Sequence, residues 1–372
     1  MANWEVSSFI IACVLILVAG AISLKLRFPS AILEIFFGAL AGTLGITVNR
    51  ELEVLATIGV ILLMFIAGTE VDVSLLRLNY LRCLVVGTSS FLAPLVTMTL
   101  ILITIGFDLM SSLLISTALS TTSVAVVYAF LDQSNLRGTK TGVLILTSAM
   151  IVDILSMAFL SIVFVGTSVL VALYILLMLF LIYLPRIFKR ITRLGSDFEI
   201  KFIFMILIVL ALLSEFIGVH SILTAFILGI FVSETFKEHK VLEHKIRGLA
   251  FAFLIPFFFF VAGLYINLST IHEYLFLIML FVIAPLILKY TFTALPLNFI
   301  VKVKSSKLPT VFAARLTLST IAAVVGLELS IIEVNVYSAI LVSALISAIA
   351  VAVLMHKLPY AVSYTHLTLP TN

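Results

Sequence analysis

The sequence predicts an all-α polytopic membrane protein with about thirteen transmembrane helices. Of its 372 residues, 63% are hydrophobic and 11% are charged, whereas a soluble domain is nearer to half apolar and a quarter charged. Apolar runs of helix length recur along the chain, and basic residues collect in alternate connections between them. A soluble core of this length could not bury so much apolar surface, so lipid is expected to surround most of the chain.

Thirteen apolar runs have the length that a spanning helix needs, about 20 residues. The first run has no basic region before it and no small-residue cleavage site after it, so it is predicted to be a membrane helix rather than a removed signal peptide. The predicted spans are 6–25, 29–47, 53–69, 82–106, 109–130, 140–165, 168–187, 200–217, 219–235, 248–265, 273–299, 309–330 and 334–356.

The basic residues predict the orientation of these spans. All but three of the 22 Lys and Arg fall in connections on one side of the membrane if the N-terminus is outside. Arg50 is on the opposite side, and Lys289 and Arg315 lie within spans. Because cytoplasmic loops carry the excess of Lys and Arg, the N-terminus is predicted outside and the C-terminus in the cytoplasm. The net charge of +4 therefore reflects topology and does not indicate a nucleic-acid partner.

The last ten residues, 363–372, are polar and do not continue the pattern of spans. We interpret them as a non-native tail, which leaves residues 1–362 as one transmembrane domain. This interpretation leaves room for a cytoplasmic regulatory domain beyond the given chain.

A carboxylate stands in the middle of one predicted span. Asp153 lies in 140–165, about 20 Å of helix from either end at 1.5 Å per residue. An ionisable side chain at that depth is costly and usually marks a transport or proton pathway. The alternative is a structural carboxyl that neighbouring hydroxyls, such as those of Ser148 and Ser156, satisfy.

A lysine stands at similar depth in another span. Lys289 is near the middle of 273–299, too deep for its ammonium to reach either interface comfortably. It is predicted to compensate the charge of Asp153, and the alternative is a structural charge that pairs with a carboxylate or caps broken backbone. Arg315, Glu34 and Glu215 lie nearer to span ends, where a solvated or structural role is the simpler interpretation.

Hydroxyl-rich segments at membrane depth predict two broken helices. Residues 116–123 and 317–320 are dense in Ser and Thr, which bond backbone groups and allow a helix to unwind, although such residues also serve helix packing. With 168–187 as a connector, these two helices take the fifth position of two six-helix halves, and an Ala-Pro-Leu tripeptide recurs in the fourth, at 93–95 and 284–286. An odd helix between the halves inverts the second, so we predict two inverted repeats with broken crossing helices 5 and 12.

Five segments in order resemble the sodium/hydrogen exchanger family of monovalent cation:proton antiporters. Residues 59–72 (GVILLMFIAGTEVD) are similar to its third-helix motif, and 120–123 (STTS) to its unwound fifth helix. Asp153 stands where the family places its cation- and proton-binding carboxylate. Residues 256–263 (PFFFFVAG) resemble a tenth-helix signature, and Lys289 matches a basic position of the eleventh helix.

The resemblance implies a secondary transporter of the cell membrane that exchanges Na⁺ or K⁺ for H⁺ by alternating access, with no enzymatic activity and no cofactor. It implies core helices within 82–165 and 273–356 that move against dimerisation helices within 6–69 and 200–265, in a homodimer. It also implies that Asp153 holds the monovalent cation or the proton. The predicted cation and proton ligands are Asp153, Thr121, Thr122, Ser123, Ser148 and Ser156, with Lys289 compensating charge.

Two departures from the family pattern bear on stoichiometry. Many electrogenic members carry a second carboxylate immediately before the binding aspartate, where this chain has Val152. The twelfth helix also lacks a Pro-Arg-Gly-Glu-like stretch that some relatives carry. With one titrating carboxylate at mid-membrane, we predict one cation exchanged for one proton, without net charge movement. The alternatives from other classes are a sodium-coupled organic-anion symporter of similar fold and a cation channel.

Overall fold

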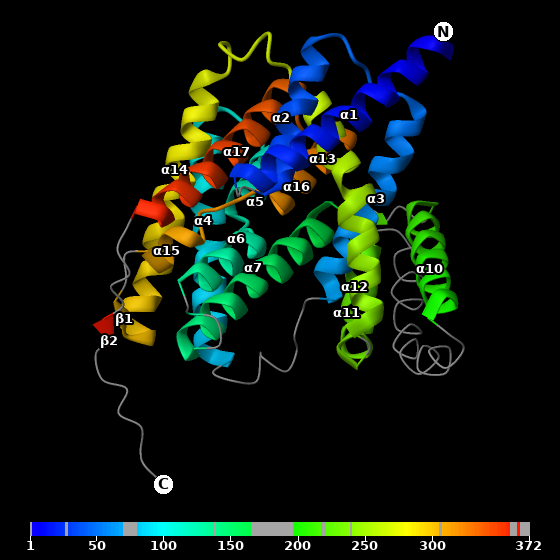
Figure 1. The fold of residues 1–372 in the computed structure, drawn as a ribbon. Coiled ribbons are helices and arrows are strands. Elements are labelled where there is room, and N and C mark those ends of the chain that lie inside the picture. The colour runs from blue at the N-terminus through cyan, green and yellow to red at the C-terminus, as the bar shows by residue number, and fades with distance from the viewer. Residues whose placement is uncertain are drawn as a thin grey trace. The chain divides into compact units, whose positions relative to one another are not determined.

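The computed structural model describes the chain apart from residues 1, 27–28, 70–79, 135, 137–138, 165–195, 217–220, 239, 305–306, 358–362 and 365–372 (Figure 1). Within the described residues, seven helices are long and apolar enough to cross a membrane, and four shorter apolar helices accompany them. The predicted all-α membrane fold is confirmed. The predicted span 168–187 lies outside the described residues, so the count of thirteen spans and the inverted repeat stay predictions.

The chain divides into two compact units. Unit 1 comprises Met1–Asp72 and Ser161–Tyr265, and unit 2 comprises Val73–Leu160 and Ile266–Asn372. Each unit thus joins one segment from the first half of the sequence with one from the second. The roles predicted for the helices in them, dimerisation and ion exchange, stay predictions.

In unit 1, pairs of helices approach one another closely at glycine. Its elements are α1 (Ala2–Leu26), α2 (Ser30–Thr43), α3 (Arg50–Thr69), α10 (Ser196–Phe216), α11 (Ser221–Glu238), α12 (Lys240–Leu249), the π-helix η3 (Ala250–Leu254) and α13 (Ile255–Leu264). A Cβ atom at Gly38 of α2 would collide with the Phe260 carbonyl of α13, and one at Gly263 of α13 would collide with the Ile35 carbonyl of α2. Glycine at both positions therefore lets the two backbones touch, as small residues do in membrane helix pairs.

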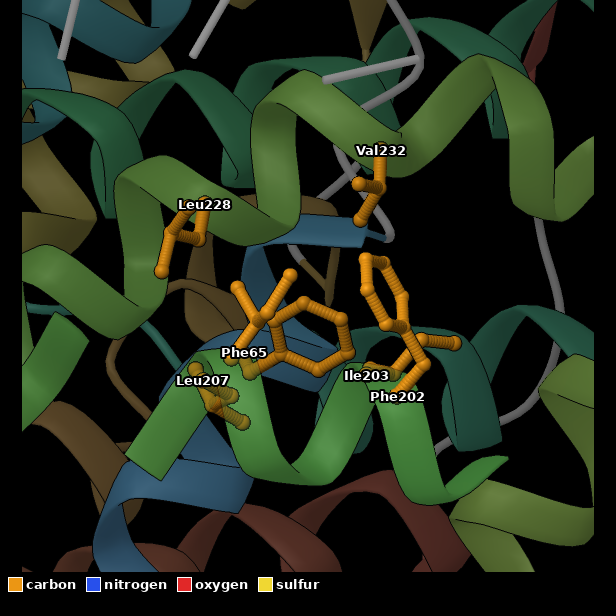
Figure 2. Close-up of a pocket in the computed structure, with 7 residues that line it drawn as sticks. Phe65, Phe202, Ile203, Leu207, Leu228 and Val232 are labelled. Atoms are coloured by element: carbon orange, nitrogen blue, oxygen red, sulfur yellow. The ribbon is translucent and has the colours of Figure 1, made fainter. Parts of the chain in front are cut away.

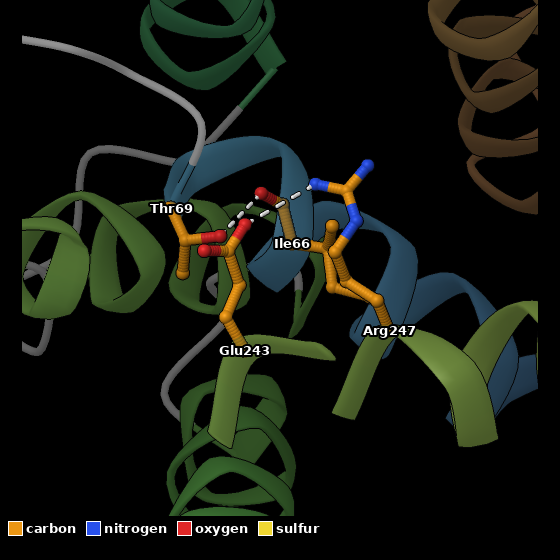
Figure 3. Close-up of polar contacts among 4 residues, drawn as sticks. All are labelled: Ile66, Thr69, Glu243 and Arg247. Carbon is orange, nitrogen blue, oxygen red and sulfur yellow. Dashed lines mark hydrogen bonds and ion pairs between the residues drawn. The ribbon is translucent and has the colours of Figure 1, made fainter. Parts of the chain in front are cut away.

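Two local polar contacts lie in the last turn of α3 and within α12. The Thr69 hydroxyl donates a 2.7 Å hydrogen bond to the Ile66 carbonyl in the last turn of α3, and Arg247 pairs with Glu243 one turn earlier in α12 at 3.7 Å (Figure 3). The pair is partly exposed, and pairs of this kind contribute little to stability.

Unit 2 contains the helices that the sequence marks with charge and hydroxyl groups. Its elements are α4 (Tyr80–Ile105), α5 (Leu109–Ser120), α6 (Val124–Gln133), α7 (Lys140–Phe164, extending past the unit boundary), α14 (Leu275–Pro296), the π-helix η4 (Leu297–Val301), β1 (Val303–Lys304), α15 (Lys307–Val311), α16 (Thr317–Glu328), α17 (Val334–Lys357) and β2 (Ser363–Tyr364). The short strands β1 and β2 pair antiparallel, with Val303 opposite Tyr364 and Lys304 opposite Ser363. The second strand falls in the segment interpreted as a non-native tail, an interpretation that stays a prediction.

Helix α5 starts at a side-chain cap. The Asp108 carboxylate accepts a 3.1 Å hydrogen bond from the Ser111 amide, which satisfies one of the donors that every helix start leaves free. Hydrogen bonds from Ser111 hold the pKa of Asp108 below its usual value. This cap fixes the point from which α5 runs to its break.

Candidate ion-binding site

Two helical segments of unit 2 are interrupted within the spans predicted to contain broken helices. Helix α5 ends at Ser120 and α6 begins at Val124, so residues 121–123 are not helical. Helix α15 ends at Val311 and α16 begins at Thr317, which leaves 312–316 as the second break. The two predicted broken helices are therefore confirmed. The second break lies just before the hydroxyl cluster of 317–320, which forms the first turn of α16 instead of unwinding.

The two breaks bond to each other, so the broken helices cross. The Ser123 amide donates a 2.7 Å hydrogen bond to the Ala314 carbonyl. The Thr122 hydroxyl donates a 3.0 Å hydrogen bond to the Phe312 carbonyl. Non-helical backbone at membrane depth is tolerated only where protein groups satisfy it, and each break here satisfies part of the other.

Lys289 of α14 holds the end of α5. Its side chain is fully buried, and its ammonium donates to the carbonyls of Ser120 at 2.6 Å and Thr121 at 2.7 Å and to the Thr122 hydroxyl at 2.7 Å. A helix C-terminus carries partial negative charge on its unpaired carbonyls, which favours a cation there. Lys289 thus caps broken backbone, one of the two roles that the sequence left open.

The predicted charge compensation of Asp153 by Lys289 stays a prediction, and the hydrogen bonds of the lysine go to the end of α5. An ammonium has three N–H donors, and all three bond to residues 120–122. Asp153 instead interacts with Lys289 electrostatically, as Arg315 also does. The ammonium satisfies the freed carbonyls of α5, which would be costly to leave buried without a donor.

Asp153 lies in α7 and is partly buried, while its neighbour Val152 is fully buried in the apolar core of unit 2. The Ser156 hydroxyl donates a 2.9 Å hydrogen bond to the backbone carbonyl of Asp153. The Ser148 side chain is fully buried, and its hydroxyl has no hydrogen-bond partner among the described residues. Ser148 and Ser156 thus lie on the same helix as Asp153, and Val152 packs among apolar side chains.

The structure brings several of the predicted ligands together at the crossing. Thr121, Thr122 and Ser123 are buried and form the first break. The Thr121 hydroxyl donates a 3.0 Å bond to the Ala118 carbonyl, which leaves its oxygen lone pairs free to accept. Ser123 takes part through its backbone amide. The shared role of these hydroxyls and the carboxylate of Asp153 as ligands stays a prediction.

Sequence reasoning missed the part that Arg315 plays. The side chain is 1% exposed, and its guanidinium donates to the Phe281 carbonyl of α14 at 2.7 Å and, more weakly, to the Leu119 carbonyl of α5 at 3.4 Å. The signal was available, because an arginine inside a span directly before a run of hydroxyl residues is unusual. Glu34, expected near a solvated span end, is also buried at 3% exposed, whereas Glu215 is exposed.

A separate pocket in unit 1 has a different character. It lies among α3, α10 and α11, and Figure 2 shows aromatic and aliphatic side chains turned toward it. The residues that line it are Phe65, Phe202, Ile203, Ile206, Leu207, Leu228 and Val232. An all-apolar lining offers no ligand for an ion, so the polar crossing in unit 2 is the candidate site.

Comparison with known proteins identifies the family. A family model described as "Sodium/hydrogen exchanger, transmembrane" matches residues 11–357. The chain belongs to this family. The membership of this family that the sequence predicted is confirmed, and the role of the crossing of the two broken helices as the ion site stays a prediction.

Similar proteins align with between 72% and 95% of this chain. A probable Na⁺/H⁺ antiporter 3 of Methanocaldococcus jannaschii is 30% identical over 370 residues, which is 94% of this chain and 95% of that protein. The Na⁺/H⁺-K⁺ antiporter GerN of Bacillus cereus is 28% identical over 72% of this chain and 73% of its own length. The solved structure of the sodium proton antiporter MjNhaP1 from M. jannaschii at pH 8 has the same fold, with a TM-score of 0.70 at 14% identity, over 95% of this chain and 96% of that one.

Proposed function

We propose that the chain is a secondary active antiporter of the cell membrane that exchanges a monovalent cation, Na⁺ or K⁺, for H⁺. Relatives with this family fold are named as Na⁺/H⁺ and Na⁺/H⁺-K⁺ antiporters. The observation that carries the proposal is the pair of crossing breaks in unit 2, held by Lys289, with Asp153 in electrostatic reach of that lysine.

In this proposal Asp153 is the shared site for cation and proton. A carboxylate that holds a proton is neutral and no longer attracts a cation, so the two occupants exclude each other. Such competition couples the two flows without a second device. Carboxylate, hydroxyl and carbonyl oxygens are the ligands that a hard cation prefers, and Asp153, Thr121 and Thr122 supply these groups, with Ser123, Ser148 and Ser156 as further candidates.

Two helix starts give Asp153 a second role in the proposal. Helices α6 and α16 both begin at the crossing, and each start carries partial positive charge that favours an anion. Lys289 balances the opposite end, that of α5. A negative Asp153 would offset the helix starts in the cation-bound or empty state, so protonation changes the electrostatic balance of the crossing and biases alternating access.

The assembly and orientation complete the proposal. We propose a homodimer formed by helices within 6–69 and 200–265, with the N-terminus outside and the C-terminus in the cytoplasm, because 19 of the 22 basic residues would then lie on the cytoplasmic side.

The test is proton flux in proteoliposomes that contain the purified protein and a pH-sensitive dye inside. Adding Na⁺, K⁺ or Li⁺ outside, one at a time, should move protons outward at once for at least one of them. A sodium-coupled symporter would require an added organic anion for flux. A channel would pass cation current without proton movement, and either result would overturn the antiport proposal.

A further inference from the structure

Helix α14 presents one continuous buried stripe that contains both prolines and the lysine. Its buried residues recur every three or four positions and so lie on one face of the helix. They are Ile278, Phe281, Pro285, Lys289, Thr293 and Pro296. Lys289 therefore lies one turn beyond Pro285 on the same face, and any change in the helix at Pro285 changes where the lysine points.

A proline inside a helix removes the hydrogen bond to the carbonyl four residues earlier. Pro285 frees the carbonyl of Phe281, and Pro296 frees the carbonyl of Phe292. In water these carbonyls would be solvated, but in a membrane a neighbouring group must satisfy them. The structure supplies a donor to each.

The two freed carbonyls have different partners. The Phe281 carbonyl accepts a 2.7 Å bond from the Arg315 guanidinium, and the Phe292 carbonyl accepts a 2.7 Å bond from the Ser89 hydroxyl. Burying a neutral hydroxyl as the donor costs little free energy, whereas burying a charged guanidinium costs much more. A hydrogen bond to the Phe281 carbonyl alone therefore does not explain why an arginine is buried here.

The guanidinium of Arg315 also bonds to a second helix, α5. The same guanidinium bonds to the Leu119 carbonyl in the last turn of α5 at 3.4 Å, beside the carbonyls of Ser120 and Thr121 that Lys289 holds. Together with the Thr121 hydroxyl on the Ala118 carbonyl, these contacts account for every carbonyl from 118 to 121. Among the described residues, Arg315 forms no ion pair with a carboxylate. Its partners are backbone carbonyls, which suits a group that positions backbone.

We propose that Arg315 is a positioning residue, whose guanidinium takes the place of the amide N–H that Pro285 lacks and so holds α14, with Lys289, against the end of α5. Pro285 removes one backbone hydrogen bond from α14, which stays helical through this point, and Arg315 from the second break supplies the missing donor. The effect on exchange rests on the function proposed above, while the structural link between Arg315 and Pro285 does not.

The link predicts a specific rescue. Arg315→Met keeps an apolar stem but leaves the Phe281 carbonyl without a donor. Pro285→Ala gives that carbonyl its own backbone N–H again. The double variant Arg315→Met/Pro285→Ala should therefore recover part of what Arg315→Met loses, because only the Leu119 contact stays unsatisfied.

The experiment compares four proteins in proteoliposomes and in detergent: wild type, each single variant and the double variant. Arg315→Met should exchange about tenfold more slowly, since a buried unsatisfied carbonyl disfavours the native arrangement by a factor of that order. The double variant should return to within about threefold of Pro285→Ala. Arg315→Met should also shift the pH of half-maximal exchange, because Lys289 loses its fixed position, and the double variant should shift it back.

The second proline gives a matched control. Ser89→Ala leaves the Phe292 carbonyl without its hydrogen-bond donor. In Ser89→Ala/Pro296→Ala, the backbone N–H of residue 296 can donate to that carbonyl instead. Ser89→Ala should lower the thermal unfolding temperature, and Ser89→Ala/Pro296→Ala should recover part of the loss. Neither variant should shift the pH of half-maximal exchange, because Ser89 does not contact the end of α5.

Several results would overturn the proposal. It fails if Arg315→Met behaves as wild type, if the double variant is no better than Arg315→Met, or if the pH profile moves equally in the Ser89 control. If Arg315→Met does not accumulate in the membrane, Arg315→Lys and Arg315→Lys/Pro285→Ala replace it, and equal activity in those two also overturns the link. If the wild type shows no cation-dependent proton flux, the proposed function fails, and the unfolding temperatures of the same four proteins still decide whether Arg315 and Pro285 are coupled.

Discussion

The ammonium of Lys289 donates a 2.6 Å hydrogen bond to the carbonyl of Ser120, the last residue of α5. The two residues are 169 positions apart in the sequence, so this bond joins the first segment of unit 2 to the second. A lysine buried among carbonyls holds a broken helix end in place, and the same ammonium lies within electrostatic reach of Asp153. The arrangement ties the structure of the crossing to the charge state of one carboxylate.

Replacing Lys289 by methionine should destabilise unit 2. The apolar stem is kept, but the carbonyls of Ser120 and Thr121 lose their donor at full burial. Each such loss costs about 1 to 3 kcal/mol, so the free energy of unfolding should fall by about 2 to 6 kcal/mol for the two carbonyls. Thermal unfolding in detergent measures this, with Lys201→Met, at an exposed lysine of α10, as the control. Equal unfolding temperatures for the two variants would contradict the capping role.

Asp153→Asn should abolish cation/proton exchange while the protein still inserts and folds. The amide keeps the size of the side chain but neither titrates nor carries charge. Cation-induced dequenching of a dye that reports a pH gradient in vesicles is the measurement. Glu215→Gln, at an exposed carboxylate, controls for the loss of a carboxylate as such and should exchange normally. Near-normal exchange by Asp153→Asn would remove this residue from the mechanism.

Thr122 accepts a hydrogen bond from Lys289 and donates one to the Phe312 carbonyl, so its hydroxyl joins the two breaks. Thr122→Val keeps the shape and removes both bonds. Exchange should slow about tenfold, measured as the initial rate of proton flux at saturating cation. Thr122→Ser retains the hydroxyl and should stay close to wild type. If valine and serine variants exchange equally fast, the hydroxyl has no part in the crossing.

The topology of the chain can be tested with reporters. A reporter fused after Lys357 should be cytoplasmic, and one inserted near Gly166 should be external, because alternate connections carry nearly all the Lys and Arg. Protease protection or a compartment-specific enzyme reporter gives the answer. Two reporters on the same side would break the thirteen-span topology.

The sequence predicted the broken helices because their cause is local. Hydroxyl residues compete for backbone bonds wherever they stand, so the run at 120–123 already marks the first break. The second break was placed less well: it falls at 312–316, where nothing polar but Arg315 distinguishes the chain, because the partners that stabilise it come from the other break.

The partners of the buried cations could not be predicted from the sequence. Lys289 was expected to compensate Asp153, the opposite charge at similar depth. Its hydrogen bonds to the end of α5 could not be foreseen, because the carbonyls that are freed there depend on where α5 stops. Arg315 bonds to residues 34 and 196 positions away, and only the folded chain brings those carbonyls to it. Local chemistry thus identified the residues that matter, and tertiary contacts decided what each one does.

Exchange is predicted to be electroneutral, with one cation for one proton. The Thr122 hydroxyl donates its only proton to the Phe312 carbonyl, so it must accept in its bond with Lys289. The ammonium then donates three bonds, to Ser120, Thr121 and Thr122, and a neutral amine has only two N–H groups to give. The prediction therefore assumes that Lys289 keeps its proton while these bonds persist, and Val152 has no group that titrates.

Asp153 is then the single group that gains and loses a proton in each cycle, and one proton exchanged for one monovalent cation moves no net charge. Imposing a membrane potential on proteoliposomes in a potassium-free ion system tests this. A net charge that crosses the membrane changes the driving force by about 2.3 kcal/mol per 100 mV, whereas the electroneutral exchange rate should not respond. A rate that rises or falls steeply with voltage, or a measurable transport current, would show that a second proton moves and that Lys289 releases its bonds during the cycle.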